Sequence, residues 1–290
     1  MNPYDLRVEN LIEPAAVPTA SPRFSWKLPS EPDPAATQSA YQLQLATTAE
    51  LLKKNAPDLW DSGRIPSERT WIVAYGGPSL RAGGTYYWRV RLWTKSERSS
   101  HWSPTARFGV GLLEEKDWCA HWISHTTDDG TPAGRTCHVQ PLKEEDLDPW
   151  RKVPAVRRAS MCARGSFEIA GPIAEAKVHI CGLGHYRLWC NGREIGQDVL
   201  QPAWSDYDRR CYVNTYDLSS ALQPGRNVLA VLLGNGFYNV VGGTGRYAKL
   251  LVSFGAPKLR LQAQVQTTVG KTAVLATDRS WKFAPSAITF

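Results

Sequence analysis

Acidic side chains are the first groups in this sequence that could do chemistry. Two carboxylates about 5–9.5 Å apart can cleave a glycosidic bond, one as the acid and the other as the nucleophile or base. A charge cluster in a loop is usually solvated, so we expect no catalytic residue in the acidic cluster of this sequence. We expect no catalytic residue elsewhere in the chain either. The cluster lies in a polar segment without periodicity or an aromatic frame and comprises Asp128, Asp129, Glu144, Glu145, Asp146 and Asp148.

Another pair of acids has a better frame. Asp206 and Asp208 lie in "WSDYDRR", beside Trp204 and Tyr207. An aromatic plane packs against the apolar C–H face of a sugar ring, and carboxylates or amides bind the hydroxyls. The alternative is that the two acids pair with the arginines at 209–210 or cap a turn.

The segment "LGNGFY" at 233–238 offers the same combination of amide and aromatic side chains. Its alternative reading is a tight, Gly-bounded turn that packs Phe237 and Tyr238 inward. The two segments together predict a carbohydrate-binding surface of five residues: Trp204, Asp206, Tyr207, Asn235 and Tyr238.

Other reaction chemistries lack their residues. No GxSxG nucleophile elbow occurs, and "GGTGRY" at 242–247 lacks the Lys-Ser/Thr of a phosphate-binding loop. The histidines show no ligand spacing and the cysteines form no CxxC pair, so we expect no metal site and no cofactor. Free buried thiols are the default for the six cysteines: Cys119, Cys137, Cys162, Cys181, Cys190 and Cys211.

Charge and hydropathy argue against two classes of partner. The net charge of +7 comes from 34 basic and 27 acidic residues that are scattered, without an aromatic-basic motif, so nucleic-acid binding is not expected. No apolar run of about 18 residues occurs, so no membrane association is expected. The N-terminus shows no basic segment followed by an apolar one. We therefore expect no classical signal peptide, which favours the cytoplasm and leaves the localisation open.

Period-2 alternation dominates the chain and predicts an all-β protein of two β-sandwiches. Twelve Trp, 23 Gly and 20 Pro among 290 residues suit strands joined by tight turns. We expect a fibronectin type III or immunoglobulin-like sandwich over 1–112. A linker and irregular loop over 113–163 should follow, and then a jelly-roll-like sandwich over 164–290.

Two short stretches make sharper predictions. In 86–93 the alternation puts Arg89 and Arg91 on the face opposite Trp88, where their guanidinium groups could stack beside Trp102. "NG" at 191–192 predicts a tight hairpin, because both turn positions favour positive φ.

The ordered set of segments resembles the N-terminal, non-catalytic half of bacterial and fungal α-L-rhamnosidases. The segments that carry it include "PRFSWKL", "AYQLQLATT", "YYWRVRLWT", "GLGHYRLWCNGREIGQDVLQPAWSDYDRR" and "TDRSWKF", and they span most of the chain except about 124–163. The resemblance implies a fibronectin-type domain followed by the rhamnosidase N-domain, ahead of an (α/α)6 barrel that carries the catalytic carboxylates. The chain stops before that barrel, so we expect it to be inactive alone.

The resemblance also implies partners. The chain would scaffold the missing catalytic barrel of an enzyme that hydrolyses terminal α-L-rhamnose, and it could contact rhamnose-containing glycosides. Some similar sandwiches bind L-rhamnose through calcium, using an acidic-amide pair before the strand that ends in Asn-Gly. Leu183 and Gly184 stand there in this sequence, which argues against calcium. The alternative is a protein-interaction sandwich without glycan recognition. If domains are missing, Phe237, Tyr238 and the tail 287–290 should expose apolar surface.

Overall fold

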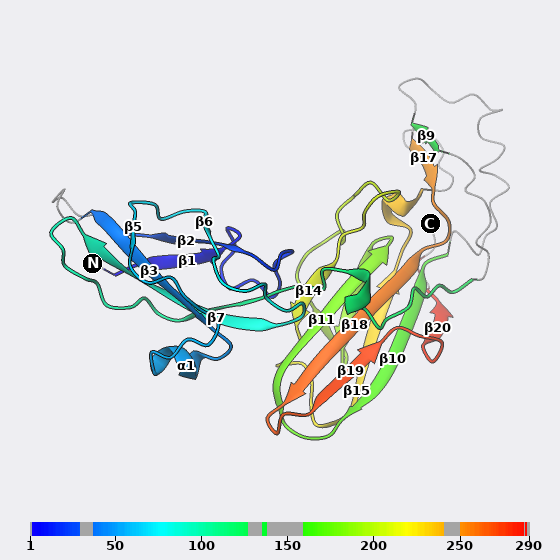
Figure 1. The fold of residues 1–290 in the computed structure, drawn as a ribbon. Helices are drawn as coiled ribbons and strands as arrows, with labels where there is room; N and C mark the ends of the chain where they lie inside the picture. The colour runs from blue at the N-terminus through cyan, green and yellow to red at the C-terminus, as the bar shows by residue number, and fades with distance from the viewer. Residues whose placement is uncertain are drawn as a thin grey trace. The chain divides into compact units, whose positions relative to one another are not determined.

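The computed structural model describes residues 2–29, 37–126, 135–137, 159–240, 250–286 and 288 (Figure 1). It divides into two compact units, Met1–Asp117 and Trp118–Phe290. Both are built from antiparallel strands, which confirms the predicted all-β class. In the part of the chain that the structure describes, no helix is long and apolar enough to span a membrane.

The first unit contains two sheets. One has the order β1-β2-β6, and the other has the order β4-β3-β7-β8, with β5 paired to β3. Phe24 lies at the centre of the core, with ring centroids 4.7 Å from Trp88 and 5.9 Å from Phe108. The elements are β1 (Tyr4–Val8), β2 (Arg23–Lys27), β3 (Gln38–Ala46), α1 (Ala49–Lys53), β4 (Trp60–Asp61), β5 (Ile65–Pro66), β6 (Val73–Ala74), β7 (Thr85–Thr94), β8 (Ala106–Gly109) and η2 (Glu115–Asp117).

The outer face of β7 carries the predicted stack of arginine and tryptophan. The guanidinium carbons of Arg89 and Arg91 lie 4.2 and 4.7 Å from the ring centroid of Trp102. Arg89 donates to Gln44 Oε1 at 3.0 Å, and Arg91 donates to Gln42 Oε1 at 2.9 Å. Burial, followed by the charge of Arg91, lowers the pKa of Arg89. Stacking on Trp102 and hydrogen bonds to the two glutamines together stabilise two charged guanidinium groups on a partly buried sheet face.

The second unit is a sandwich of two larger sheets, with orders β13-β12-β15-β10-β20 and β14-β11-β18-β19. A small sheet, β16-β17-β9, completes it. Its elements are β9 (Arg135–Cys137), β10 (Met161–Ile169), β11 (Ile173–Leu183), β12 (Tyr186–Cys190), β13 (Arg193–Ile195), β14 (Asn214–Asp217), β15 (Gly225–Leu233), η3 (Gly236–Tyr238), β16 (Asn239–Val240), β17 (Leu250–Ser253), β18 (Lys258–Thr267), β19 (Thr272–Ala276) and β20 (Lys282–Pro285).

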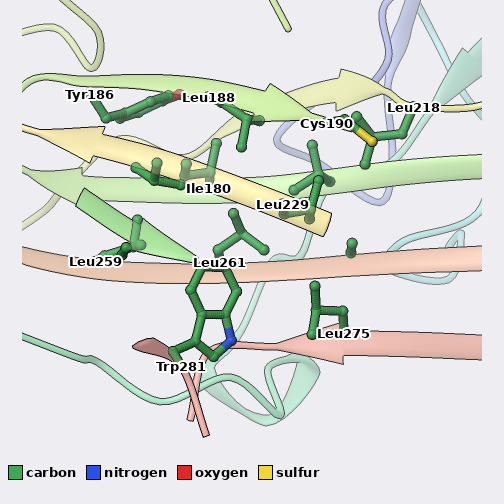
Figure 2. Close-up of a cluster of buried hydrophobic side chains, with 14 of the residues drawn as sticks. Ile180, Tyr186, Leu188, Cys190, Leu218, Leu229, Leu259, Leu261, Leu275 and Trp281 are labelled. Carbon is green, nitrogen blue, oxygen red and sulfur yellow. The ribbon is translucent and has the colours of Figure 1, made fainter. Parts of the chain in front are cut away.

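Apolar residues at alternate positions of both large sheets meet in one core. Figure 2 shows Leu188, Leu229, Leu261 and Trp281 projecting into the space between the strands. The segment after the unit boundary belongs to this sandwich, because Ile123 forms a β-bridge with Leu259. Of the predicted linker 113–163, residues 127–134 and 138–158 lie outside the described residues, and with them all six clustered acids.

The Asn-Gly hairpin forms as predicted. Asn191 and Gly192 have φ of 51° and 83°. The Asn191 side chain accepts from the Val228 amide at 2.9 Å and donates to the Ala221 carbonyl at 3.0 Å. The amide of this turn is thus used by the fold itself.

Candidate carbohydrate-contact site

The irregular segment 197–213, between β13 and β14, carries an exposed aromatic platform. Trp204 is 57% exposed and stacks on Phe237 of η3, with ring centroids 4.9 Å apart and planes 12° from parallel. Parallel stacking on a second ring fixes the indole without covering it fully. Both residues lie in segments whose composition indicated sugar contact, but no sequence pattern pairs side chains 33 positions apart.

Tyr207 and Tyr238 belong to a neighbouring aromatic cluster with Phe254. Tyr207 lies with its centroid 5.3 Å from each of the other two rings, edge to face. Tyr238 is buried, and its hydroxyl donates to the Phe254 carbonyl at 2.9 Å. Burial, followed by the thiols of Cys181 and Cys211, raises the pKa of Tyr207. The cluster holds the loop onto η3.

This burial corrects one expectation from the sequence. Tyr238 was predicted to present its ring at the surface, but it packs inward as in the alternative of a Gly-bounded turn. Phe237 is half-buried because Trp204 covers one side of it. Residues 287, 289 and 290 of the tail lie outside the described residues, and Ile288 is 50% exposed.

Asp206 both shapes a turn and keeps its carboxylate accessible. Its carbonyl accepts from the amides of Arg209 and Arg210 at 2.9 and 2.8 Å. Its carboxylate lies 3.5 Å from the Arg209 Nε, with both side chains more than half exposed. An exposed pair of this kind contributes at most about 1 kcal/mol, so a sugar hydroxyl could displace it.

Asn235 is 8% exposed and belongs to a polar network beneath the platform. Its Oδ1 accepts from the Asn239 Nδ2 at 3.0 Å, and Asn239 Oδ1 accepts from Ser253 Oγ at 2.7 Å. The network ties η3 to β17. Asn235 is also the only one of the five predicted residues that lines the large cleft beside the platform, described next.

A cleft of about 990 Å³ opens beside η3. Its charged and imidazole groups were not among the predicted site residues, although the alternation in "HYRLW" places His185 and Arg187 on one face. Arg187 donates to Glu194 through Nε at 2.7 Å and through a second nitrogen, and this bidentate pair lowers the pKa of Glu194. Lining residues include His185, Arg187, Glu194, Asp198, Asn235 and Phe237.

His185 joins the cleft to the platform. Its ring meets Phe237 edge-on, with centroids 5.8 Å apart. Its Nδ1 is buried and makes no hydrogen bond with the described residues. Burial lowers the pKa of His185, and the backbone of Gln201 and Pro202 partly offsets this.

The structure explains why a glycine stands at position 184. Gly184 has φ of 128°, and a Cβ built there would lie 2.1 Å from the Gly234 carbonyl oxygen. An acid or amide cannot occupy this position without moving that backbone. Within the described ranges, no three His, Cys, Asp or Glu side chains cluster as metal ligands. Free thiols occur at Cys119, Cys162, Cys181 and Cys190; the last two are buried as expected, whereas the first two are exposed.

Comparison with known proteins defines the class of these two units. Residues 3–114 match the family model of a Rha78A-like, N-terminal immunoglobulin domain. Residues 171–290 match the model of the alpha-L-rhamnosidase N-terminal domain. The first unit is therefore the immunoglobulin-like one of the two predicted sandwich types, and the chain is a tandem of rhamnosidase N-terminal β-domains.

The chain spans about 30% of the length of the alpha-L-rhamnosidases that it matches. An alpha-L-rhamnosidase of Formosa agariphila is 32% identical over 280 residues, which are 96% of this chain and 29% of that protein. One of Alteromonas sp. (strain LOR) is 31% identical over 98% of this chain and 29% of its own length. The alpha-L-rhamnosidase structure from Dictyoglomus thermophilum superposes with a TM-score of 0.80 at 30% identity, covering 100% of this chain and 30% of that one. The chain corresponds to an N-terminal portion of alpha-L-rhamnosidases.

Proposed function

We propose that the protein containing this chain hydrolyses terminal α-L-rhamnose from glycosides, and that these residues are its accessory region. In this role the chain supports the catalytic barrel and contacts the glycoside. The ordered pair of rhamnosidase N-terminal domains supports the first part. The exposed stack of Trp204 on Phe237 is the observation that carries the second part.

The chemistry of a sugar explains how the platform would act. The indole of Trp204 offers an apolar plane to the C–H face of a pyranose. Asp206 lies two residues away with an accessible carboxylate that can accept from ring hydroxyls. Tyr207 packs segment 197–213 against Tyr238 of η3, and Asn235, which precedes η3, lines the cleft.

A protein partner has its own supporting observation. Val199 and Leu200 line the cleft and are 82% and 70% exposed. Two adjacent, highly exposed apolar side chains at a loop favour contact with another protein surface. The catalytic barrel is the partner that fits the proposed enzyme. A protein-interaction module without glycan recognition is the second candidate.

A binding experiment separates the two candidates. Methyl α-L-rhamnoside is titrated into the 290-residue chain and into the Trp204→Ala variant, with calorimetry or tryptophan fluorescence as the readout. We expect Trp204→Ala to weaken binding about fivefold or more, since packing of a sugar ring on an aromatic plane is worth about 1 kcal/mol or more. Trp71→Ala is the matched control, because Trp71 is 60% exposed but lies in the first unit.

Two results would contradict the proposal. Absence of rhamnoside binding by the parent chain would leave only the protein-interaction candidate. Turnover of an aryl α-L-rhamnoside by the chain alone would show that it is more than an accessory region.

A further inference from the structure

The register of the five-stranded sheet aligns five residues in one row on its outer face. Glu194 of β13 lies opposite Trp189 of β12, which lies opposite Ala230 of β15. Ala230 lies opposite Arg164 of β10, and Arg164 lies opposite Lys282 of β20. The strand neighbours Leu188, Val231 and Ala163 point into the core, so the row faces away from it.

Two cations at one end of this row oppose each other without an acid. Arg164 and Lys282 are both exposed and directly cross-strand. Like charges in this arrangement destabilise a sheet. Neither side chain forms an ion pair with the residues that the structure describes. At the other end of the row, by contrast, Glu194 is paired with Arg187.

The row borders a hollow that can hold a ligand. A second cleft, of about 480 Å³, is lined by Arg164, Trp189, Ala230 and Lys282. Leu232 lines both this cleft and the one of about 990 Å³, so the two adjoin. The small side chain of Ala230 leaves space between Trp189 and the cations. Each of the two clefts has the size found in ligand sites, and the smaller one combines an aromatic ring with charged groups.

We propose that this outer face binds an acidic sugar residue, with a uronate carboxylate held by Arg164 and Lys282 and the sugar ring against Trp189. The planar guanidinium of Arg164 can take the carboxylate with two parallel hydrogen bonds, and the ammonium of Lys282 adds a second charge. A neutral sugar would leave the two cations facing each other. This inference rests on the proposed contact with glycosides and adds the charge of the glycan and a separate set of residues.

The test compares two disaccharides that differ only in one group. The probes are α-L-rhamnosyl-D-glucuronate and the same disaccharide with the carboxylate reduced to an alcohol, giving rhamnosyl-glucose. Calorimetry at low salt should show the acidic probe binding about tenfold more tightly, since hydrogen bonds to charged groups are the stronger ones. The double variant Arg164→Ala/Lys282→Ala should lose this advantage, while the affinity for the neutral probe stays within twofold.

Controls keep the outcome specific. Lys271→Ala/Arg279→Ala removes the same charge from two exposed residues outside both clefts and should leave the tenfold preference intact. Loss of folding is not expected in the Arg164/Lys282 variant, whose melting temperature should equal or exceed that of the parent because a repulsion is removed. Trp189→Ala should weaken both probes.

Equal affinity of the parent for the two probes would overturn the inference and leave the proposed glycoside contact standing. An equal loss of the acidic preference in the Lys271/Arg279 control would also overturn it, since the preference would then come from net charge. If neither probe binds, both the inference and the proposed glycoside contact fail.

Discussion

Lowering the pH should destabilise the second unit through one buried imidazole, His179 in β11. The side chain is fully buried, its Nδ1 lies 2.8 Å from Thr215 Oγ1, and its Nε2 has no hydrogen-bond partner among the described residues. Its ring packs edge-on to Trp118, with centroids 6.5 Å apart. Burial, followed by the charge of Lys177, lowers the pKa of His179 to about 4.

The surrounding charges favour the neutral ring. Lys177 is buried on the same strand and pairs with Glu175 at 3.4 Å. Arg260 of the neighbouring β18 lies over Trp118 and donates to the Ala120 carbonyl. Protonation of His179 would therefore add a third positive charge, beside Lys177 and Arg260, to a buried sheet face whose adjacent carboxylate is Glu175.

The sign and the size follow from linkage. The unfolded histidine takes a proton near pH 6.5, whereas the folded one stays neutral until about pH 4, so stability is lost as the pH falls through this window. The loss is about 2 kcal/mol at pH 5 and approaches about 3 kcal/mol below pH 4. For a unit of this size, a loss of about 2 kcal/mol lowers the melting temperature by roughly 4–8 °C.

Urea unfolding at pH 7.5 and pH 5.0, followed by tryptophan fluorescence, measures the effect. The His179→Gln variant has no titrating ring, so its loss of stability between the two pH values should be smaller than that of the parent by about 2 kcal/mol. His121→Gln, at an exposed position of the same unit, should keep the dependence of the parent. An identical pH dependence in His179→Gln and the parent would refute this account of the buried imidazole.

Three further perturbations test other contacts. Trp102→Ala removes a ring that holds two guanidinium groups and should lower the free energy of unfolding of the first unit by about 1–3 kcal/mol in urea titrations. Gly184→Ala should lower the melting temperature far more than Gly192→Ala, because both have positive φ but only the first places a Cβ against a backbone carbonyl. Phe237→Ser removes the partner of Trp204 and should weaken rhamnoside binding, measured by calorimetry, without abolishing the fold.

Strand faces were predictable from the sequence because side chains alternate with a period of two. That rule placed Trp88 in the core and Arg89 beside Trp102, as the structure has them. The hairpin at Asn191 was predictable because its φ requirement is local. In each of these cases the controlling interaction lies within a few residues or follows from the strand period itself.

The candidate site was less predictable because it depends on partners distant in the chain. Tyr238 packs against Tyr207 and Phe254, and no periodicity relates these three positions. Trp204 meets Phe237 through a segment without regular structure. Aromatic and polar composition identified the loops, whereas which ring faces solvent depended on their packing.

The outer row of the sheet shows a second kind of limit. Alternation puts Arg164, Trp189 and Lys282 on outward faces, but only the strand order and register place them side by side. The same side-chain types have different consequences according to their cross-strand neighbour. Arg187 forms an ion pair with Glu194 on the neighbouring strand and is neutralised within the fold, whereas Arg164 opposite Lys282 leaves positive charge that a bound anion can neutralise. The end of the row with the two opposed cations also borders Trp189 and the smaller cleft. We therefore place the proposed recognition of a charged glycan there.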